Sequence, residues 1–388
     1  MIRTTNIFLV IIGSLLVIGF CAIYSSGFSL SVGINSDTMI VNHCAYVFIS
    51  ILGFYIASKI DYHIYKKLAL PLIILSGLML VAVLIPGISR EVFGARRWIV
   101  IAGVSIQPTE LAKIASVLYL SHLLCQKQDK LSYFWKGFVM SFLPVGIIIF
   151  LIAIEPDLGN AILLSSTVLL MMQISGFHWK YFSFLSPIAI VMMIGMLIKF
   201  DHIKNRISGF LNPEELKASS GYQAYMAVTS IGSGGLTGVG LGEGQIKLHY
   251  LPFVNNDFIA SLIGEEAGFL GMSVLILLFV GLVFFGLKIA INSKDLLGTL
   301  IAFGLIFMAG FQAVFHIGVN LSLLPTKGIS LPFVSYGGTS LIVLMASMGI
   351  VYNIGLQGRP KVESHELGAK EVPYRIVSVR KKPDSVVT

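Results

Sequence analysis

Charged side chains are scarce in this sequence of 388 residues: Asp, Glu, Lys and Arg make up 12% of it, whereas 56% of the residues are hydrophobic. Soluble globular domains carry about 25% charged residues. Half that charge density excludes a soluble enzyme, a disordered protein and a secreted disulfide scaffold. The apolar side chains must therefore face lipid, and the composition predicts a membrane protein that crosses the bilayer many times.

Cysteine pairs and nucleotide-binding motifs are also missing. The three cysteines, Cys21, Cys44 and Cys125, lie in apolar stretches without a CxxC pair, which indicates small buried side chains rather than a metal site or a disulfide. The glycine-dense stretch 230–244 contains neither a strict GxGxxG nor a GK[ST] motif. Chemistry or transport must therefore draw its energy from the substrate or from a gradient.

Apolar runs of the length that a membrane span needs, about 20 residues, recur along the chain. They lie at about 7–26, 40–58, 69–87, 109–125, 138–154, 158–175, 181–199, 258–288, 297–318 and 338–356. We therefore expect an all-α membrane domain over residues 1–357 with about ten transmembrane helices, and a flexible tail over 358–388. Because the run 258–288 carries Glu265 and Glu266, we expect its first part to be tilted or to lie inside the bundle.

The Lys and Arg residues indicate the orientation of the spans. With a cytoplasmic N-terminus, most of the 27 Lys and Arg residues fall in cytoplasmic loops and in the tail. This distribution follows the positive-inside rule and predicts that both termini are cytoplasmic. The net charge of +8 then reports orientation and not a nucleic-acid partner.

One outer loop, about 200–257, is far longer than the others. Loops of this length are usually functional or disordered. Glycines at seven positions within 230–244 indicate flexible or tightly turned backbone near a ligand. We expect a long flexible loop that covers a polar cavity opening outward and suited to an amphipathic, anionic substrate.

Polar residues cluster in the outer half of the membrane domain, where each ionisable group is a candidate for function. Glu110 and Lys113 are three residues apart and share a helix face, so they form either an ion pair that fixes helix packing or part of a site. Arg97 is either an anchor at the membrane interface or a phosphate ligand. The residues alone leave these alternatives open.

Two aspartates and one lysine stand at the ends of spans. Asp157, in the short turn 155–159, is expected to cap the next helix. Asp257 is either a helix cap or a carboxylate whose raised pKa makes it a base. Lys327 is the only charge in the stretch 324–340, whose prolines and glycines exclude a regular helix and predict backbone that lines a cavity.

Several motifs in these segments occur in a fixed order between Gly94 and Gly338. They read GARRWI, SIQPTELAK, EPDLG, GYQA, IGSGGLTGVGLG, NDFIASLIGEEAG and LPTKGISLPFVSYGG. Together with the ten expected spans they resemble the SEDS family (shape, elongation, division and sporulation) of peptidoglycan polymerases. The LPTKG form of the last motif resembles the cell-division branch of that family more than the elongation branch.

The resemblance implies a glycosyltransferase that joins lipid II, an undecaprenyl-pyrophosphate-linked disaccharide peptide, on the outer face of the bacterial cytoplasmic membrane. Undecaprenyl pyrophosphate is then the leaving group, which accounts for the missing nucleotide motif. The implied partners are a class B penicillin-binding protein and other division proteins of the membrane. The resemblance implies no certain cofactor; a divalent cation, Mg²⁺ or Mn²⁺, between pyrophosphate and carboxylates is an alternative, with metal ligands unknown.

The resemblance also assigns residues. Asp257 is implied to be the general base for the acceptor sugar's 4-hydroxyl. The implied substrate-binding residues are Arg97, Glu110, Lys113, Asp157, Gln223, Lys327 and Ser335. The sequence departs from the family pattern LPEAHTDF just before the aspartate, where Phe253 replaces a glutamate and Asn255 replaces a histidine.

Two other functions are consistent with the sequence. The first is a flippase for lipid-linked precursors, which requires polar groups through the full membrane thickness. The concentration of polar residues in the outer half argues against it. The second is a scaffold that holds helices and recruits division proteins without catalysis.

Overall fold

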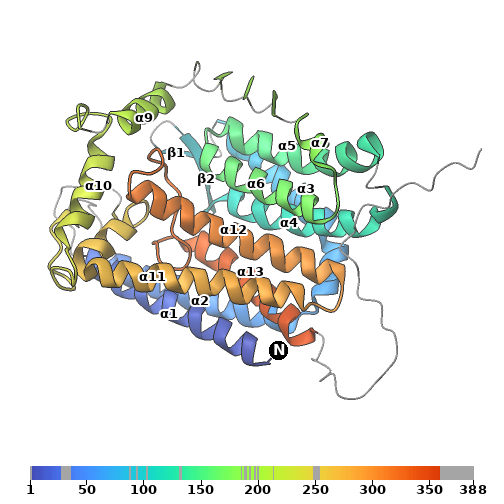
Figure 1. Ribbon diagram of the computed structural model, residues 1–388, viewed down its shortest axis with the longest axis horizontal. Coiled ribbons are helices and arrows are strands. Elements are labelled where there is room, and N and C mark those ends of the chain that lie inside the picture. The colour runs from blue at the N-terminus through green and yellow to red at the C-terminus, as the bar shows by residue number, and fades with distance from the viewer. Residues whose placement is uncertain are drawn as a thin grey trace, which may run out of the picture.

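The structure, a computed structural model, describes most of the chain (Figure 1). The described residues are 2–27, 36–86, 89–92, 95–101, 104–130, 133–184, 186–187, 190–191, 194–195, 198, 201–212, 214–247 and 254–358. Phe253 and the expected tail beyond Gly358 lie outside them.

Seven helical segments of the described chain are long and apolar enough to cross a membrane. They contain α1 (Ile2–Ser26), α2 (Ser36–Lys59), α3 (Tyr65–Leu84), α5 (Met140–Ile154), α11 (Ile259–Ile291), α12 (Leu296–Asn320) and α13 (Gly338–Gln357). A 3₁₀ turn, η2 (Tyr62–Ile64), precedes α3, and a π-helical turn, η4 (Phe134–Val139), precedes α5. A helical membrane protein with several spans, as the apolar runs predict, is confirmed.

Two shorter or more polar helices fill the middle of the bundle. They are α4 (Pro108–Gln126), followed by the turn η3 (Gln128–Lys130), and α6 (Leu158–Ile174). Both pack against α12, and α4 is buried over most of its length. Within the expected span 181–199, several residues lie outside the described part of the chain. The short helix α7 (Trp179–Phe182) is described just before them, and the span itself stays a prediction.

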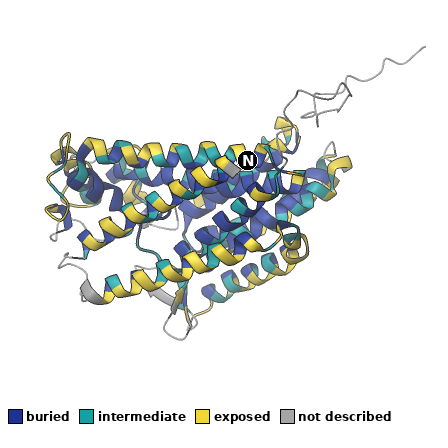
Figure 2. Cartoon of the chain, turned by 90° about the horizontal axis from the view of Figure 1, so that it is seen from below, coloured by how far each residue is buried: buried dark blue, intermediate teal, exposed yellow. Residues whose placement is uncertain are grey.

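Apolar side chains cover both the inside and the outside of the bundle. One continuous cluster of buried residues runs through the interior. The exposed faces of the outer helices (Figure 2) also carry large apolar side chains, among them Val10, Phe48, Leu78 and Leu277. Soluble proteins rarely expose such continuous apolar surface, so these faces are the ones that contact lipid.

The described part of the outer loop, residues 201–212, 214–247 and 254–257, is folded, contrary to the expectation of a flexible segment. It contains α9 (Asp201–Leu211) and α10 (Tyr222–Ser233), which lie at one end of the bundle (Figure 1). A small antiparallel sheet lies near the same end, with strands β1 (Ser89–Val92), β2 (Ala95–Ile101) and β3 (Val104–Ile106) in the order β1-β2-β3. Contacts with α11 and α12 hold α10 in place, a tertiary effect that glycine content does not reveal.

The long helix α11 is kinked at Gly268, whose φ of 63° requires glycine. The part before the kink is buried and includes Glu265 and Glu266, whereas the part after it exposes apolar side chains such as Leu277. The expectation that the first part of the run 258–288 lies inside the bundle is therefore confirmed. The kink keeps the two glutamates out of the lipid-facing part of the helix.

The close pairing of α2 with α13 gives a test of packing. A Cβ on Gly349 would collide with the carbonyl oxygen of Phe54 on α2. Overpacking of this kind costs about 1–3 kcal/mol, so we expect Gly349→Ala to lower the melting temperature of the protein in detergent. Gly53→Ala on the facing helix is the control, because its Cβ would lie 3.9 Å from the carbonyl oxygen of Ile342, an ordinary contact. An unchanged melting temperature for Gly349→Ala would show that the pair has room to move apart.

Candidate active site

A cavity of about 120 Å³ lies at the end of the bundle that carries α9 and the sheet. Five segments meet around it: strand β2, the turn before α6 together with the start of that helix, helix α9, helix α12 and the loop before α13. Its lining residues are Arg97, Pro156, Asp157, Leu158, Gly159, Ile162, Ile203, Arg206, Ile207, Phe315, Pro325, Thr326, Lys327 and Gly328. The cavity therefore combines an apolar floor with three cationic side chains and one carboxylate.

Arg97 ties the sheet to the turn between α5 and α6. Its Nε donates to the carbonyl oxygen of Glu155 at 3.3 Å, and its Nη2 donates to that of Pro156 at 2.7 Å. These bonds leave part of the guanidinium on the cavity wall. Both readings of Arg97, an anchor and a ligand for an anion, are therefore compatible with its position.

Asp157 caps α6, as expected from the sequence. Its carboxylate accepts the Asn160 backbone N–H at 3.5 Å and the Asn160 side-chain amide at 2.8 Å. The Asn160 amide oxygen in turn accepts from Lys113 Nζ at 3.1 Å. A chain of polar contacts thus runs from the cavity wall into the bundle.

Glu110 and Lys113 form a buried ion pair of 2.8 Å, and Lys113 Nζ also donates to Gln312 Oε1 at 3.3 Å. Lys113 is only 1% exposed and does not line the cavity. The structure therefore favours the packing alternative for this pair. Its link to the cavity is indirect, through Asn160 and Asp157, and its expected contact with substrate stays a prediction.

Asp257 lies next to Gly328, which lines the cavity, although Asp257 is not itself a lining residue, and its side chain does not cap a helix. The N-cap of α11 is Phe258, and no side chain caps that helix. The carboxylate makes no hydrogen bond to any residue in the described part of the chain. Its Oδ2 lies 3.1 Å from where a Cβ on Gly328 would stand, so the carboxylate faces the stretch of loop that lines the cavity.

The backbone around Asp257 is held from two neighbouring elements. The Asp257 carbonyl accepts from the Asn320 amide at 3.0 Å, and the Asn256 carbonyl accepts from the Ser335 hydroxyl at 2.7 Å. Ser335 also accepts the Leu331 N–H at 2.7 Å and is buried. The hydroxyl of Ser335, expected to bind substrate, is thus occupied in fixing the segment that carries Asp257.

The two departures from the family pattern are only partly visible. Phe253 lies outside the described residues. The Asn255 carbonyl accepts the Tyr336 N–H at 2.9 Å, and its side-chain amide contacts the Met39 sulfur at 3.0 Å. Asn255 therefore packs toward α2 and supports the backbone next to Asp257.

Electrostatic shifts set the protonation states in and near the cavity. Burial raises the pKa of Asp257 to about 6 against the opposing pull of the Arg206 and Arg97 guanidinium groups. Burial lowers the pKa of Lys327 to about 8, and it raises that of Glu155 to about 8 with help from the nearby charge of Asp157. At a pH between these two values, Asp257 is mostly a carboxylate and Lys327 mostly a cation.

Arg206 is the site residue that sequence reasoning missed. It lines the cavity from α9, together with Ile203 and Ile207. These positions are three and four residues apart, the spacing of one helix face. The sequence contains that spacing. It points to a shared helix face only if a helix is expected in the outer loop, and none was.

The remaining expected residues are placed as follows. Lys327 lines the cavity, in a non-helical loop as expected. Gln223 lies half-buried on α10 and is not among the lining residues, so its contact with substrate stays a prediction. Within the described residues, no three His, Cys, Asp or Glu side chains are grouped to hold a metal. Because the cavity instead gathers cationic side chains, its donor set does not fit a divalent cation and we derive no step through one.

The chain is similar to known proteins over most of its length. Residues 5–359 match the family described as "Cell cycle protein", that of FtsW, RodA and SpoVE. A protein named "Probable peptidoglycan glycosyltransferase FtsW" from Geobacter sp. (strain M18) is 37% identical over 314 residues, which cover 81% of this chain and 86% of that protein. "Stage V sporulation protein E" from Bacillus subtilis (strain 168) is 34% identical over 311 residues, 80% of this chain and 85% of that one.

Solved structures show the same fold. A chain from a peptidoglycan synthase complex that coordinates polymerization and crosslinking superposes with a TM-score of 0.75 at 25% identity, covering 90% of this chain and 96% of that one. The rod shape determining protein RodA of Thermus thermophilus gives a TM-score of 0.64 at 24% identity, with 91% and 97% covered, and supports the fold alone. From the match of nearly the whole sequence and the shared fold, the chain belongs to the FtsW, RodA and SpoVE family of cell cycle proteins.

Proposed function

We propose that this protein is a peptidoglycan glycosyltransferase that polymerises lipid II during cell division. The observation that carries the proposal is the environment of Asp257: a carboxylate without a structural bond in the described chain, with a raised pKa, beside a cavity lined by Arg97, Arg206 and Lys327. A base next to a cluster of cations is what glycosyl transfer from a pyrophosphate requires.

In the proposed reaction, Asp257 takes the proton from the 4-hydroxyl of the acceptor sugar. The freed oxygen attacks the anomeric carbon of the donor, so that one C–O bond forms while the bond from that carbon to the pyrophosphate oxygen breaks. A single displacement inverts the configuration from α to β. The proton remains on the carboxylate and the electron pair leaves with undecaprenyl pyrophosphate.

The three cations would neutralise the pyrophosphate as negative charge develops on it. Arg97 and Arg206 offer planar guanidinium groups that match phosphate oxygens in pairs, whereas Lys327 supplies a compact point charge. Interactions that strengthen as charge develops lower the barrier, because they are stronger in the transition state than in the ground state. The long apolar faces of the bundle suit the lipid chains of both substrates.

The proposal includes a location and a partner. The positive-inside distribution of Lys and Arg supports an orientation in which the end of the bundle with α9 and α10 lies on the outer face of the cytoplasmic membrane, with both termini inside. The similarity to a chain of a peptidoglycan synthase complex supports a partner that crosslinks the strands, a class B penicillin-binding protein. Other division proteins of the membrane are further partners.

The flippase alternative lacks support from the buried polar groups. Glu110, Lys113 and Gln312 inside the bundle are all bound to one another or to neighbouring polar atoms, instead of lining a path. The scaffold alternative predicts that Asp257 can be replaced without effect. The experiments below therefore separate the three functions.

The central test is replacement of the base. With purified protein and lipid II, with and without the penicillin-binding protein, we expect Asp257→Asn and Asp257→Ala to lower the rate of glycan-strand formation by at least about 100-fold, the usual contribution of general-base catalysis. Asp129→Asn, an exposed carboxylate after α4, is the control. Full polymerase activity of Asp257→Ala, or lipid II scrambling by wild type without polymerisation, would contradict the proposal.

The pH profile should follow the shifted groups. The base is active as a carboxylate, so kcat/KM should rise as the pH passes about 6, the pKa of Asp257. Lys327 acts as a cation, so activity should fall again above about 8, the pKa of its ammonium group. In Lys327→Arg the guanidinium stays charged, and the fall above pH 8 should disappear. A rate that stays flat from roughly pH 5 to roughly pH 7, the window in which Asp257 titrates, would remove Asp257 from the base role.

Gly328 gives a steric test of the site. An Ala Cβ at this position would lie 3.1 Å from Asp257 Oδ2, closer than ordinary van der Waals contact. Misplaced reacting groups cost rate steeply, so we expect Gly328→Ala to lower kcat between about 10- and 100-fold with little loss of stability. Gly232→Ala on α10 is the control, because its Cβ would meet no atom within 4 Å. Equal rates for both variants would show that Asp257 does not act from its position against this loop.

A further inference from the structure

The stretch 234–247 of the outer loop, here called the glycine segment, is folded back onto α11. The Val239 N–H donates to the Glu265 carbonyl at 3.0 Å, and the Gly240 N–H donates to the Glu266 carbonyl at 3.1 Å. The approach is so close that a Cβ on Gly238, which has a φ of 84°, would collide with the Glu266 carbonyl oxygen. The backbone therefore fits the kink of α11 in one register.

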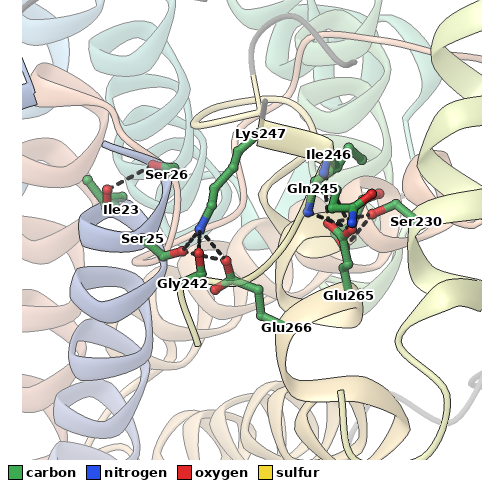
Figure 3. Close-up of polar contacts among 11 residues, drawn as sticks. Ile23, Ser25, Ser26, Ser230, Gly242, Gln245, Ile246, Lys247, Glu265 and Glu266 are labelled. Carbon is green, nitrogen blue, oxygen red and sulfur yellow. Dashed lines mark hydrogen bonds and ion pairs between the residues drawn. The ribbon is translucent and has the colours of Figure 1, made fainter. Parts of the chain in front are cut away.

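Two buried carboxylates complete this contact (Figure 3). Glu266 Oε1 forms an ion pair of 2.8 Å with Lys247 Nζ and accepts from the Ser25 hydroxyl at 2.5 Å. Lys247 Nζ also donates to Ser25 Oγ at 2.8 Å and to the Gly242 carbonyl at 2.6 Å. The ion pair thus joins the end of α1, the glycine segment and α11.

Glu265 binds the same segment through its backbone. Its carboxylate accepts the Gln245 N–H at 2.8 Å and the Ile246 N–H at 3.1 Å, and it accepts the Ser230 hydroxyl of α10 at 3.2 Å (Figure 3). Glu265, Glu266 and Lys247 are each at most 5% exposed. Burying three charges is costly unless each is paired or hydrogen-bonded. Here Lys247 and Glu266 pair with each other, and Glu265 is hydrogen-bonded.

These groups lie outside the reaction that we derived. None of the three lines the cavity, and neither carboxylate faces the cationic side chains there. Yet the chain runs from Lys247 to Asp257 in ten residues, and α11, which carries both glutamates, begins two residues after Asp257. Glu265 and Glu266 therefore hold residues 245–247, whereas Ser335 and Asn320 hold the backbone at Asn256 and Asp257.

We propose that Glu265, Glu266 and Lys247 form a clasp that positions Asp257 for catalysis. The inference rests on the proposed function. The three are positioning residues: they fix the register of the glycine segment on α11, and so hold the first turns of the helix that begins two residues after the base. A slip of one residue would leave a buried charge unpaired, which makes the clasped register the only favourable one.

The test compares a charge-neutral variant with a matched control. Lys247→Met alone leaves the Glu266 charge buried without a partner and risks misfolding. The double variant Lys247→Met/Glu266→Gln removes both charges together and keeps an acceptor for Ser25. The control is Glu243→Gln, an exposed carboxylate of the same segment.

We expect the double variant to keep its folded helices, to lower kcat about tenfold through misplacement of the base, and to change KM by less than about twofold. The rise of activity near pH 6 should shift, because the surroundings of Asp257 change. Hydrogen exchange at residues 254–260 should become faster than in Glu243→Gln. A structural role alone would lower the melting temperature without moving kcat or the pH profile, and that outcome would overturn the proposal.

Failure of the proposed function is a separate result. If wild type itself forms no glycan from lipid II, the glycosyltransferase proposal fails. The clasp is then judged by hydrogen exchange alone. Faster exchange at 254–260 in the double variant would still support a clasp that positions this segment, and unchanged exchange would overturn it.

Discussion

Pairing of buried charge is the constraint on which this structure depends. In a bundle surrounded by lipid, an unpaired charge is too costly to keep, so each buried ion must find a partner. Glu110 pairs with Lys113 and Glu266 with Lys247, while Glu265 takes its partners from backbone N–H groups. Among these acidic groups of the outer end, Asp257 stands apart, because its carboxylate has no such partner in the described chain.

Local sequence signals foretold part of this arrangement. The spacing of Glu110 and Lys113 allowed an ion pair as one of two alternatives, and the position of Asp157 ahead of an apolar run indicated a cap. Both follow from contacts within one turn of helix. The apolar runs likewise predicted most of the spans, because lipid imposes a length and a composition on each of them.

Contacts between distant segments were beyond such signals. Nothing near Asp257 in the sequence shows that its side chain does not cap α11. That depends on the hydrogen bonds by which Ser335 and Asn320 hold the backbone next to it. Arg206 reaches the cavity only because α9 folds beside it. The glycines of the outer loop predicted a flexible segment. In the structure, carboxylate and carbonyl groups of α11 accept hydrogen bonds from this backbone and hold it in place.

In the proposed reaction, the cations of the cavity act on Asp257 as well as on the substrate. Arg206 and Arg97 stabilise the carboxylate and hold its pKa below the value that burial alone would produce. In the proposed reaction, a bound pyrophosphate brings negative charge to the same guanidinium groups and offsets that stabilisation. Asp257 then becomes more basic when the donor is in place. The scarcity of charge in the chain has a chemical consequence here, since the same few cations serve both the leaving group and the base.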